Sequence, residues 1–134
     1  MLIAASVLGA CSASVGQDNP STAPWPNAVP GPEVSVTVAS ELHALGAFVL
    51  DVREPDEWAA GHIQGATLIP LGQLASRTNE VPRDRAVVVV CRSGNRSAQG
   101  RDILQGAGLT AVTSMSGGMS AWATAGLPVV SGPP

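Results

Sequence analysis

The chain has 134 residues, of which 45% are hydrophobic and 13% are charged. Its seven basic residues are all arginine, and its formal net charge at pH 7 is −3. This acidic balance gives no electrostatic reason to expect a nucleic-acid partner, because binding to phosphates depends on clustered positive charge. The two cysteines and two histidines do not have the spacing of a zinc site, so we expect no bound metal.

The first ten residues are small and apolar, and we expect them to be a signal peptide. They are too short to span a bilayer, which takes about 20 residues. Leu8-Gly9-Ala10-Cys11 resembles the bacterial lipobox, a signal in which the chain is cut before the cysteine and the cysteine then receives lipid. No basic residue precedes the apolar core, so either the signal is weak or the true start lies upstream. The alternative is an apolar tail with an incidental cysteine.

Residues 11–32 are expected to form a flexible tether. Residues 12–32 contain five prolines, several Ser, Ala and Asn, and almost no charge, a composition that cannot bury a core. About 20 such residues have a reach of roughly 25 Å, which is enough to hold a small domain off a membrane surface. The remaining residues, 33–134, are numerous enough for one domain with its own core.

Strands and helices are expected to alternate through residues 33–134. Alternating valines predict a half-buried strand over 34–38, and Ser40 is placed to cap a short helix over 40–45. Further strands are expected at 48–52, 66–70, 86–90 and 112–115, and further helices at 55–60, 71–76, 98–105 and 120–125. This order predicts an α/β fold, a mostly parallel central sheet with helices on both faces. Such sheets bind ligands beyond the carboxyl ends of their strands.

A cysteine follows the most apolar of these strands directly. Cys91 comes after a run of four valines and opens a short loop. Gly94 and Asn95 tolerate left-handed backbone angles, so the loop can curl until its N–H groups point inward and bind an anion. The helix that follows aims its positive N-terminal end at the same place.

Two permanent positive charges, on Arg92 and Arg96, lie in the same loop. A thiol in this setting is expected to ionise near neutral pH and to act as a nucleophile. Ser93 and Ser97 are expected to be loop and cap residues, since neither has a positioned base. A surface turn with an incidental cysteine is the alternative.

The six residues 91–96 resemble the active-site loop of rhodanese-like sulfurtransferases, which carry sulfur as a cysteine persulfide. Residues 50–58 and 61–66 resemble the upstream signature of that family, and residues 117–122 with 126–129 resemble its C-terminal signature. Gln64 departs from the pattern, which frequently has proline there. The resemblance implies one rhodanese-like domain over 33–134.

The resemblance also implies a reaction. Sulfane sulfur would move from thiosulfate or a similar small anion, through a persulfide on Cys91, to cyanide, a small thiol or a protein thiol, without a cofactor. Arg92 would bind the donor, and Asp51 would form a hydrogen bond toward the loop. Arg96 would either contact the anion or tie the loop to Asp51 or another carboxylate. The residues expected to surround the sulfur are Arg92, Ser93, Gly94, Asn95, Arg96 and Ser97.

Two other functions remain open at this point. One is a binding or sulfur-carrier module of the same fold without significant turnover. The other is a small phosphatase or arsenate reductase of the same fold, which the loop length disfavours because related phosphatases use a loop one residue longer to surround a phosphoryl group. With Cys11 lipidated, the domain would lie outside the cytoplasm, anchored to the bacterial cell membrane. The alternative is a soluble secreted or periplasmic protein.

Overall fold

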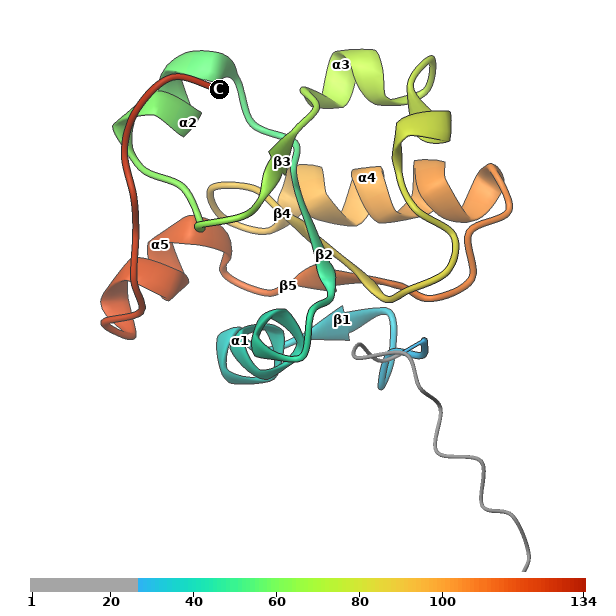
Figure 1. The fold of residues 1–134 in the computed structure, drawn as a ribbon, viewed down its shortest axis with the longest axis horizontal. Coiled ribbons are helices and arrows are strands. Elements are labelled where there is room, and N and C mark those ends of the chain that lie inside the picture. The colour runs from blue at the N-terminus through green and yellow to red at the C-terminus, as the bar shows by residue number, and fades with distance from the viewer. Residues whose placement is uncertain (1–26) are drawn as a thin grey trace, which may run out of the picture.

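In a computed structural model, which describes residues 27–134, the chain forms a five-stranded parallel sheet with the order β1-β5-β4-β2-β3 (Figure 1). The strands are β1 Glu33–Val34, β2 Phe48–Asp51, β3 Thr67–Leu68, β4 Val87–Val90 and β5 Val112–Met115. The helices are α1 Val36–Ala44, α2 Pro55–Ala60, α3 Leu71–Leu74, α4 Asn95–Gly106 and α5 Gly118–Thr124, with a 3-10 turn at Thr78–Glu80. The leader expected at 1–10, Cys11, and most of the tether expected at 11–32 lie outside the described residues.

Helices cover both faces of this sheet, which confirms the predicted α/β class (Figure 1). β4 is the central strand, and its four valines are all buried. Val88 and Val90 belong to an apolar cluster with residues of α1 and α5. Val87 and Val89 point the other way, into a second cluster with residues of α3 and α4. A strand buried on both faces explains why its sequence is continuously apolar rather than alternating.

The expected strand at 34–38 is wrong beyond its first residue. Only Glu33 and Val34 pair with β5, and α1 begins at Val36. The cap of this helix is Ser35, whose Oγ accepts a hydrogen bond of 3.2 Å from the N–H of Val38, whereas Ser40, the expected cap, lies inside the helix. A serine with extended backbone angles and a free side-chain oxygen stabilises a helix start, and here it outweighs the β preference of the valines.

The carboxyl ends of the central strands lie together at one edge of the sheet. β2 and β4 pair in parallel from Phe48↔Val87 to Asp51↔Val90. The residues that follow these two strands therefore meet at that edge, which is where Cys91 emerges. α4 begins at Asn95, three residues before the helix start expected at 98, so the helix reaches back almost to the cysteine.

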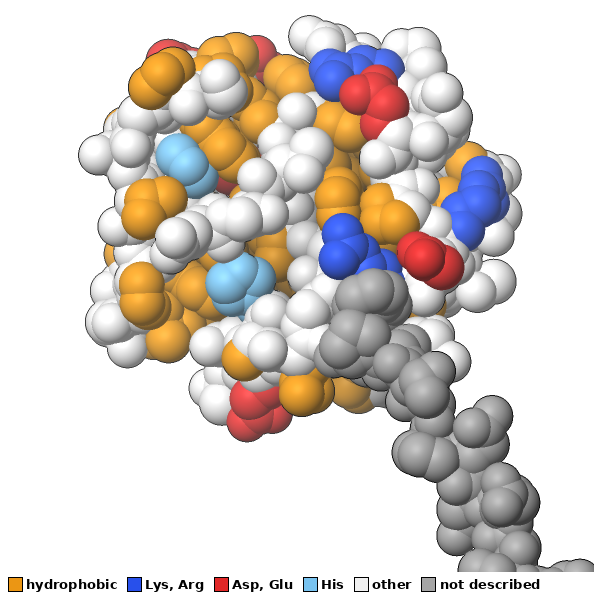
Figure 2. All heavy atoms as spheres, viewed as in Figure 1, with side chains coloured by type: hydrophobic (Ala, Val, Ile, Leu, Met, Phe, Trp, Pro, Cys, Tyr) orange, Lys and Arg blue, Asp and Glu red, His pale blue; other side chains and the backbone are white. Residues whose placement is uncertain are grey.

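The surface of the described region carries both signs of charge. On the face drawn in Figure 2, arginine and carboxylate side chains lie interspersed rather than in a patch of one sign. Within residues 27–134, no helix is both long enough and apolar enough to cross a membrane. The same residues contain no group of three or more His, Cys, Asp or Glu side chains that could hold a metal ion.

A glycine allows α4 to pack closely on the sheet. A Cβ on Gly100 would lie 3.0 Å from Cγ1 of Val89 and 3.3 Å from Cγ1 of Val52, whereas a Cβ on Gly106 would have no neighbour within 4 Å. Gly100→Ala is therefore expected to lower the free energy of unfolding by about 1 kcal/mol, because overpacking at a cost of about 1–3 kcal/mol exceeds the helix-propensity gain of about 1 kcal/mol. Gly106→Ala, the matched control, is expected to be neutral or stabilising. Urea denaturation of both variants measures this, and equal effects would contradict the packing argument.

Candidate active site

Cys91 lies at the carboxyl end of β4 and at the amino end of α4, and its side chain is enclosed by the loop between them. The residue is 1% exposed. The backbone N–H of Gly94 donates to Sγ at 3.0 Å, and the Ser97 hydroxyl oxygen lies 3.6 Å from Sγ. Gly94 has φ of +112°, so its left-handed conformation is confirmed, while Asn95 is an ordinary first helical residue. The loop has the predicted curl with one left-handed residue rather than two.

These hydrogen bonds affect the pKa of the thiol. Burial alone would raise the pKa of Cys91, because a charged sulfur loses solvation in the interior. The hydrogen bond with the Ser97 side chain and those from the backbone N–H groups of Ser97, Gly94 and Ser93 outweigh that effect and lower the pKa of Cys91 below its ordinary value. The hydrogen bonds around Sγ therefore favour the thiolate, whereas burial alone would favour the thiol.

Arg96 ties the loop to α2. Its two terminal nitrogens donate to the two carboxylate oxygens of Glu57, each at 2.8 Å. This hydrogen-bonded pair holds the pKa of Glu57 at about 2, so the carboxylate stays charged over the physiological range. Of the two expected roles for Arg96, the structure shows the tie to a carboxylate, and that carboxylate is Glu57. The paired arginine holds the loop shape rather than presenting a free charge.

Asp51 lies at the end of β2, as expected, but its hydrogen-bond partner differs from the expected one. Its carboxylate is fully buried and accepts hydrogen bonds from the backbone N–H of Arg53 at 3.0 Å and from the Arg53 guanidinium at 2.7–3.1 Å. The Asp51 carboxylate therefore bonds to Arg53, two positions along the chain, and not to the Cys91 loop as expected. Arg53 also donates to the carbonyls of Glu57 and Gly61, so Asp51 supports the loop indirectly, by fixing the arginine that fixes α2.

Arg92 differs from the other arginines because its side chain has no partner among the described residues. The other six arginines each donate a side-chain hydrogen bond to another residue of the described chain. The Arg92 side chain has no hydrogen bond or ion pair to any of residues 27–134, and it is exposed. Its charge is therefore not neutralised by any of these residues, and its role toward a ligand stays a prediction from the sequence.

The start of α5 supports the loop from the other side. The N–H of Met119 donates to the Cys91 carbonyl at 2.7 Å, and the N–H of Ser120 donates to the Arg92 carbonyl at 3.1 Å. A side chain on Gly118 would collide with the backbone of Cys91 and Arg92, and this residue has φ of +58°. Only glycine allows so close an approach.

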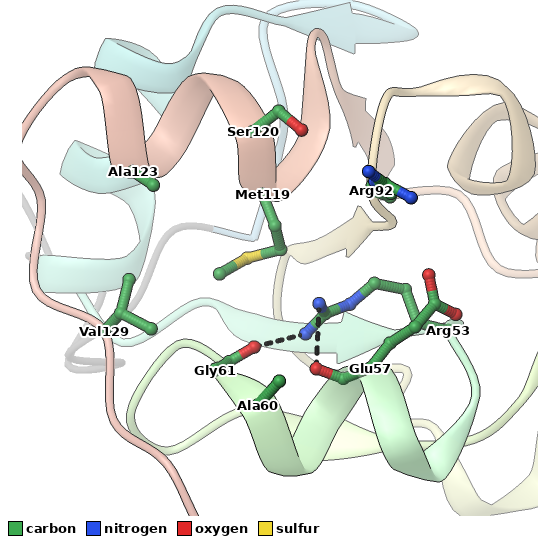
Figure 3. Close-up of a pocket in the computed structure, with 9 residues that line it drawn as sticks. All are labelled: Arg53, Glu57, Ala60, Gly61, Arg92, Met119, Ser120, Ala123 and Val129. Carbon is green, nitrogen blue, oxygen red and sulfur yellow. Dashed lines mark hydrogen bonds between the residues drawn. The ribbon is translucent and has the colours of Figure 1, made fainter.

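An open cavity of about 340 Å³ lies next to the loop, between α2 and α5 (Figure 3). Arg92 lines one side of it, and Val129 from the chain end lines the opposite side, with Met119 between them. The Arg53 guanidinium lies at the floor, where its hydrogen bonds to the Glu57 and Gly61 carbonyls hold it. The cavity thus combines a free cation near the cysteine with an apolar wall farther away.

His62 has a structural role. Its Nδ1 lies 2.8 Å from the carbonyl oxygen of Trp58, and the two rings stack with centroids 3.7 Å apart. Its backbone pairs with Val130 near the chain end. The imidazole is engaged in holding α2 and the chain end together.

Sequence reasoning missed the site roles of Glu57 and Arg53. In the sequence, Glu57 was identified only as one of the residues of the motif at 50–58. The signal that could have found it is electrostatic, since a partly buried arginine such as Arg96 favours a carboxylate partner and the motif at 50–58 supplies several. Which carboxylate pairs with which arginine depends on the placement of α2, which no local pattern contains.

Comparison with known proteins agrees with this geometry. A family model described as the rhodanese-like domain matches residues 36–125. The chain belongs to the rhodanese-like domain family. The match includes the Cys91 loop and ends with α5, before the cavity wall formed by Val129.

Relatives of this rhodanese-like protein include proteins named as sulfurtransferases. It is 42% identical over 83 residues to a sulfurtransferase of Allochromatium vinosum, covering 62% of this chain and 78% of the relative. It is 38% identical over 89 residues to the thiosulfate sulfurtransferase GlpE of Pseudomonas entomophila, covering 66% and 82%. A solved rhodanese-related protein from Thermoplasma volcanium has a TM-score of 0.69 and 32% identity, covering 75% and 98%. These relatives support a sulfurtransferase-type function.

The Ser97 hydroxyl gives a test of thiol activation. Ser97→Ala removes one hydrogen bond that favours the thiolate, so the pKa of Cys91 is expected to rise and alkylation of Cys91 by iodoacetamide to need a higher pH. The pH dependence of the alkylation rate, followed by peptide mass at Cys91, measures the shift. Ser76→Ala, which removes an exposed hydroxyl bonded to the Gln73 carbonyl, is the control. An unchanged profile in Ser97→Ala would contradict the assigned role.

Proposed function

We propose that this protein is a sulfurtransferase that moves sulfane sulfur from thiosulfate, or a similar small anionic donor, to a thiophilic acceptor through a persulfide on Cys91. The observation that carries the proposal is the thiol itself, buried at the start of α4 with the Gly94 N–H donating to Sγ at 3.0 Å. A ring of N–H donors around one sulfur suits a nucleophile that alternates between thiolate and persulfide, both of which are anions.

The first half-reaction forms the persulfide on Cys91. The Cys91 thiolate attacks the outer sulfur of thiosulfate, a sulfur–sulfur bond forms to Sγ, and the bond to the sulfonate sulfur breaks. Sulfite leaves with the bonding electron pair, and the new terminal sulfur carries the negative charge. The unpaired Arg92 binds the oxyanion end of the donor, while the loop amides stabilise the charge that remains on the enzyme.

The second half-reaction transfers the outer sulfur from the Cys91 persulfide to the acceptor. A nucleophilic acceptor, which can be cyanide or a thiolate, attacks the terminal sulfur and takes it, and the Cys91 thiolate leaves with the electron pair of the broken sulfur–sulfur bond. With a thiol acceptor the product is a new persulfide, and with cyanide it is thiocyanate. The hydrogen bonds that lower the pKa of Cys91 make its thiolate a better leaving group. No metal or organic cofactor takes part in these two steps.

Kinetics of the full chain test these roles. Cys91→Ser is expected to abolish sulfur transfer from thiosulfate to cyanide, because a serine hydroxyl cannot form a persulfide. Arg92→Ala is expected to raise KM for thiosulfate by about fivefold to tenfold, the effect of losing one charge-assisted contact at a partly solvated site. The measurement is thiocyanate formation at varied thiosulfate concentration.

A matched control for Arg92 is Arg77→Ala, since Arg77 pairs with Glu80 on the surface and does not line the cavity. Arg77→Ala is expected to leave KM unchanged. Substantial activity in Cys91→Ser would remove Cys91 from the mechanism, and an unchanged KM in Arg92→Ala would place Arg92 outside the donor site. An aryl phosphate assayed in parallel tests the phosphatase alternative, and faster phosphate hydrolysis than sulfur transfer would reverse the assignment.

The same proposal includes a location. Cys11 is lipidated, and the domain lies outside the cytoplasm, anchored to the bacterial cell membrane through the segment 11–32. The motif Leu8-Gly9-Ala10-Cys11 and the uncharged, proline-rich sequence after it support this. Stable anchoring needs two acyl chains, which the diacylglyceryl group of a bacterial lipoprotein supplies.

Detergent partitioning tests the anchor. Expressed in a bacterial host from its own reading frame with the upstream codons included, the protein is expected to enter the detergent phase, and Cys11→Ala is expected to move it to the aqueous phase because the lipid is lost. Sulfur-transfer activity serves as the folding control for both forms. Wild-type protein that stays in the cytosol with Cys11 unmodified would contradict the anchor and leave the sulfurtransferase proposal standing.

A further inference from the structure

The chain end forms one wall of the cavity beside Cys91. The C-terminal strap, residues 127–132, leaves α5 and runs back to α2 (Figure 1). The Pro128 carbonyl accepts a hydrogen bond of 2.9 Å from Nε1 of Trp122, Val130 exchanges backbone hydrogen bonds of 2.8 and 2.9 Å with His62, and the Gly132 N–H donates to the Ala59 carbonyl at 3.1 Å. These contacts fix the strap on both helices.

Within this fixed strap, one side chain remains partly uncovered. Val129 is 43% exposed, and among the described residues only Leu45 is another large hydrophobic side chain of comparable exposure. Its Cγ1 lies so close to Gly61 that a Cβ there would come within 2.8 Å of it. Val129 faces the cavity together with Ala60, Met119 and Ala123, so the wall away from the cysteine is apolar (Figure 3).

Neither thiosulfate nor cyanide can make apolar contacts with this wall, because both are small ions without an apolar body. The opposite side of the cavity has the unpaired charge of Arg92, the residue directly after the nucleophile. A persulfide on Cys91 would place its outer sulfur about 2 Å beyond the buried Sγ. The cavity, at about 340 Å³, has the size of a small-ligand site.

We propose that the cavity beside Cys91 binds the sulfur acceptor, that this acceptor is a small thiol with an apolar body and one negative charge, and that Val129 of the C-terminal strap determines its selection. This inference rests on the proposed function, and it names the substrate class of the second half-reaction. The acceptor's anionic group lies toward Arg92 and its apolar body lies against Val129, Met119 and Ala123. The acceptor thiolate attacks the outer sulfur, and the Cys91 thiolate leaves.

A pair of acceptors that differ only in the apolar body tests this with the full chain. The pair is mercaptoacetate and α-benzyl-mercaptoacetate, with thiosulfate as donor. In the wild type, KM for the benzyl compound is expected to be about tenfold lower, as burial of part of a phenyl ring predicts. Val129→Asp is expected to raise KM for both anionic thiols, because the new carboxylate repels them, and to remove the difference between them, because a charge replaces the apolar contact. The ratio of the two KM values is therefore the readout.

Leu45→Asp is the matched control, since Leu45 is also an exposed large hydrophobic residue but does not line the cavity. It is expected to keep the tenfold preference. Equal KM values for the two thiols in the wild type would overturn the inference, as would a preference that survives in Val129→Asp or is lost to the same extent in Leu45→Asp. Thermal unfolding of both variants checks that the strap substitution leaves the fold intact.

A binding measurement separates this inference from the proposed function. The S-methylated form of α-benzyl-mercaptoacetate cannot accept sulfur, so calorimetry with it reports on the cavity alone. Binding by the wild type that Val129→Asp weakens about tenfold or more supports the acceptor site. Equal binding by both would overturn it. Absence of transfer to cyanide by the wild type would overturn the proposed function, whatever the calorimetry shows.

Discussion

The site depends on a balance between burial and hydrogen bonding at one sulfur atom. Cys91 is 1% exposed, and in an apolar interior a thiol keeps its proton. Hydrogen bonds from the N–H groups near the start of α4 and the hydrogen bond with Ser97 outweigh this effect and lower the pKa of Cys91 below its ordinary value. The left-handed conformation of Gly94 turns the chain so that these donors converge. The enclosed thiol can therefore be reactive because its solvation is supplied by the backbone.

The charges around the loop are arranged so that most of them are already paired. Arg96 is neutralised by Glu57, and Arg53 by Asp51. These pairs join the loop, the end of β2 and the start of α2 into one unit, which fixes geometry rather than attracting ligands. The Arg92 side chain has no ion pair with any of residues 27–134, and Arg92 directly follows the cysteine in the sequence.

Much of this could be predicted from the sequence because the chemistry is local. The valine run, the cysteine and Gly94 are contiguous, so strand, loop and helix start follow from one short segment. The sheet class followed from the alternation of strands and helices. At the N-terminal edge, the alternating valines at 34, 36 and 38 were misleading, because the Ser35 cap starts a helix where β preference alone predicts a strand.

The remaining features depend on distances along the chain that no local pattern covers. Glu57 and Arg96 are 39 positions apart, and the choice of Glu57 over Asp51 as partner follows from where α2 packs. The cavity wall formed by Val129 depends on the backbone pairing of His62 with Val130. The leader and Cys11 lie outside the described residues, so their roles remain predictions from the sequence.

Intact-mass spectrometry of the full chain after incubation with thiosulfate tests the central claim most directly. A persulfide adds the mass of one sulfur atom and is removed by cyanide, and peptide mapping locates it. The account predicts one added sulfur per chain, located on Cys91, released by cyanide and absent from Cys91→Ser. A wild-type chain that gains no sulfur, or gains it at Cys11 instead, would contradict the account.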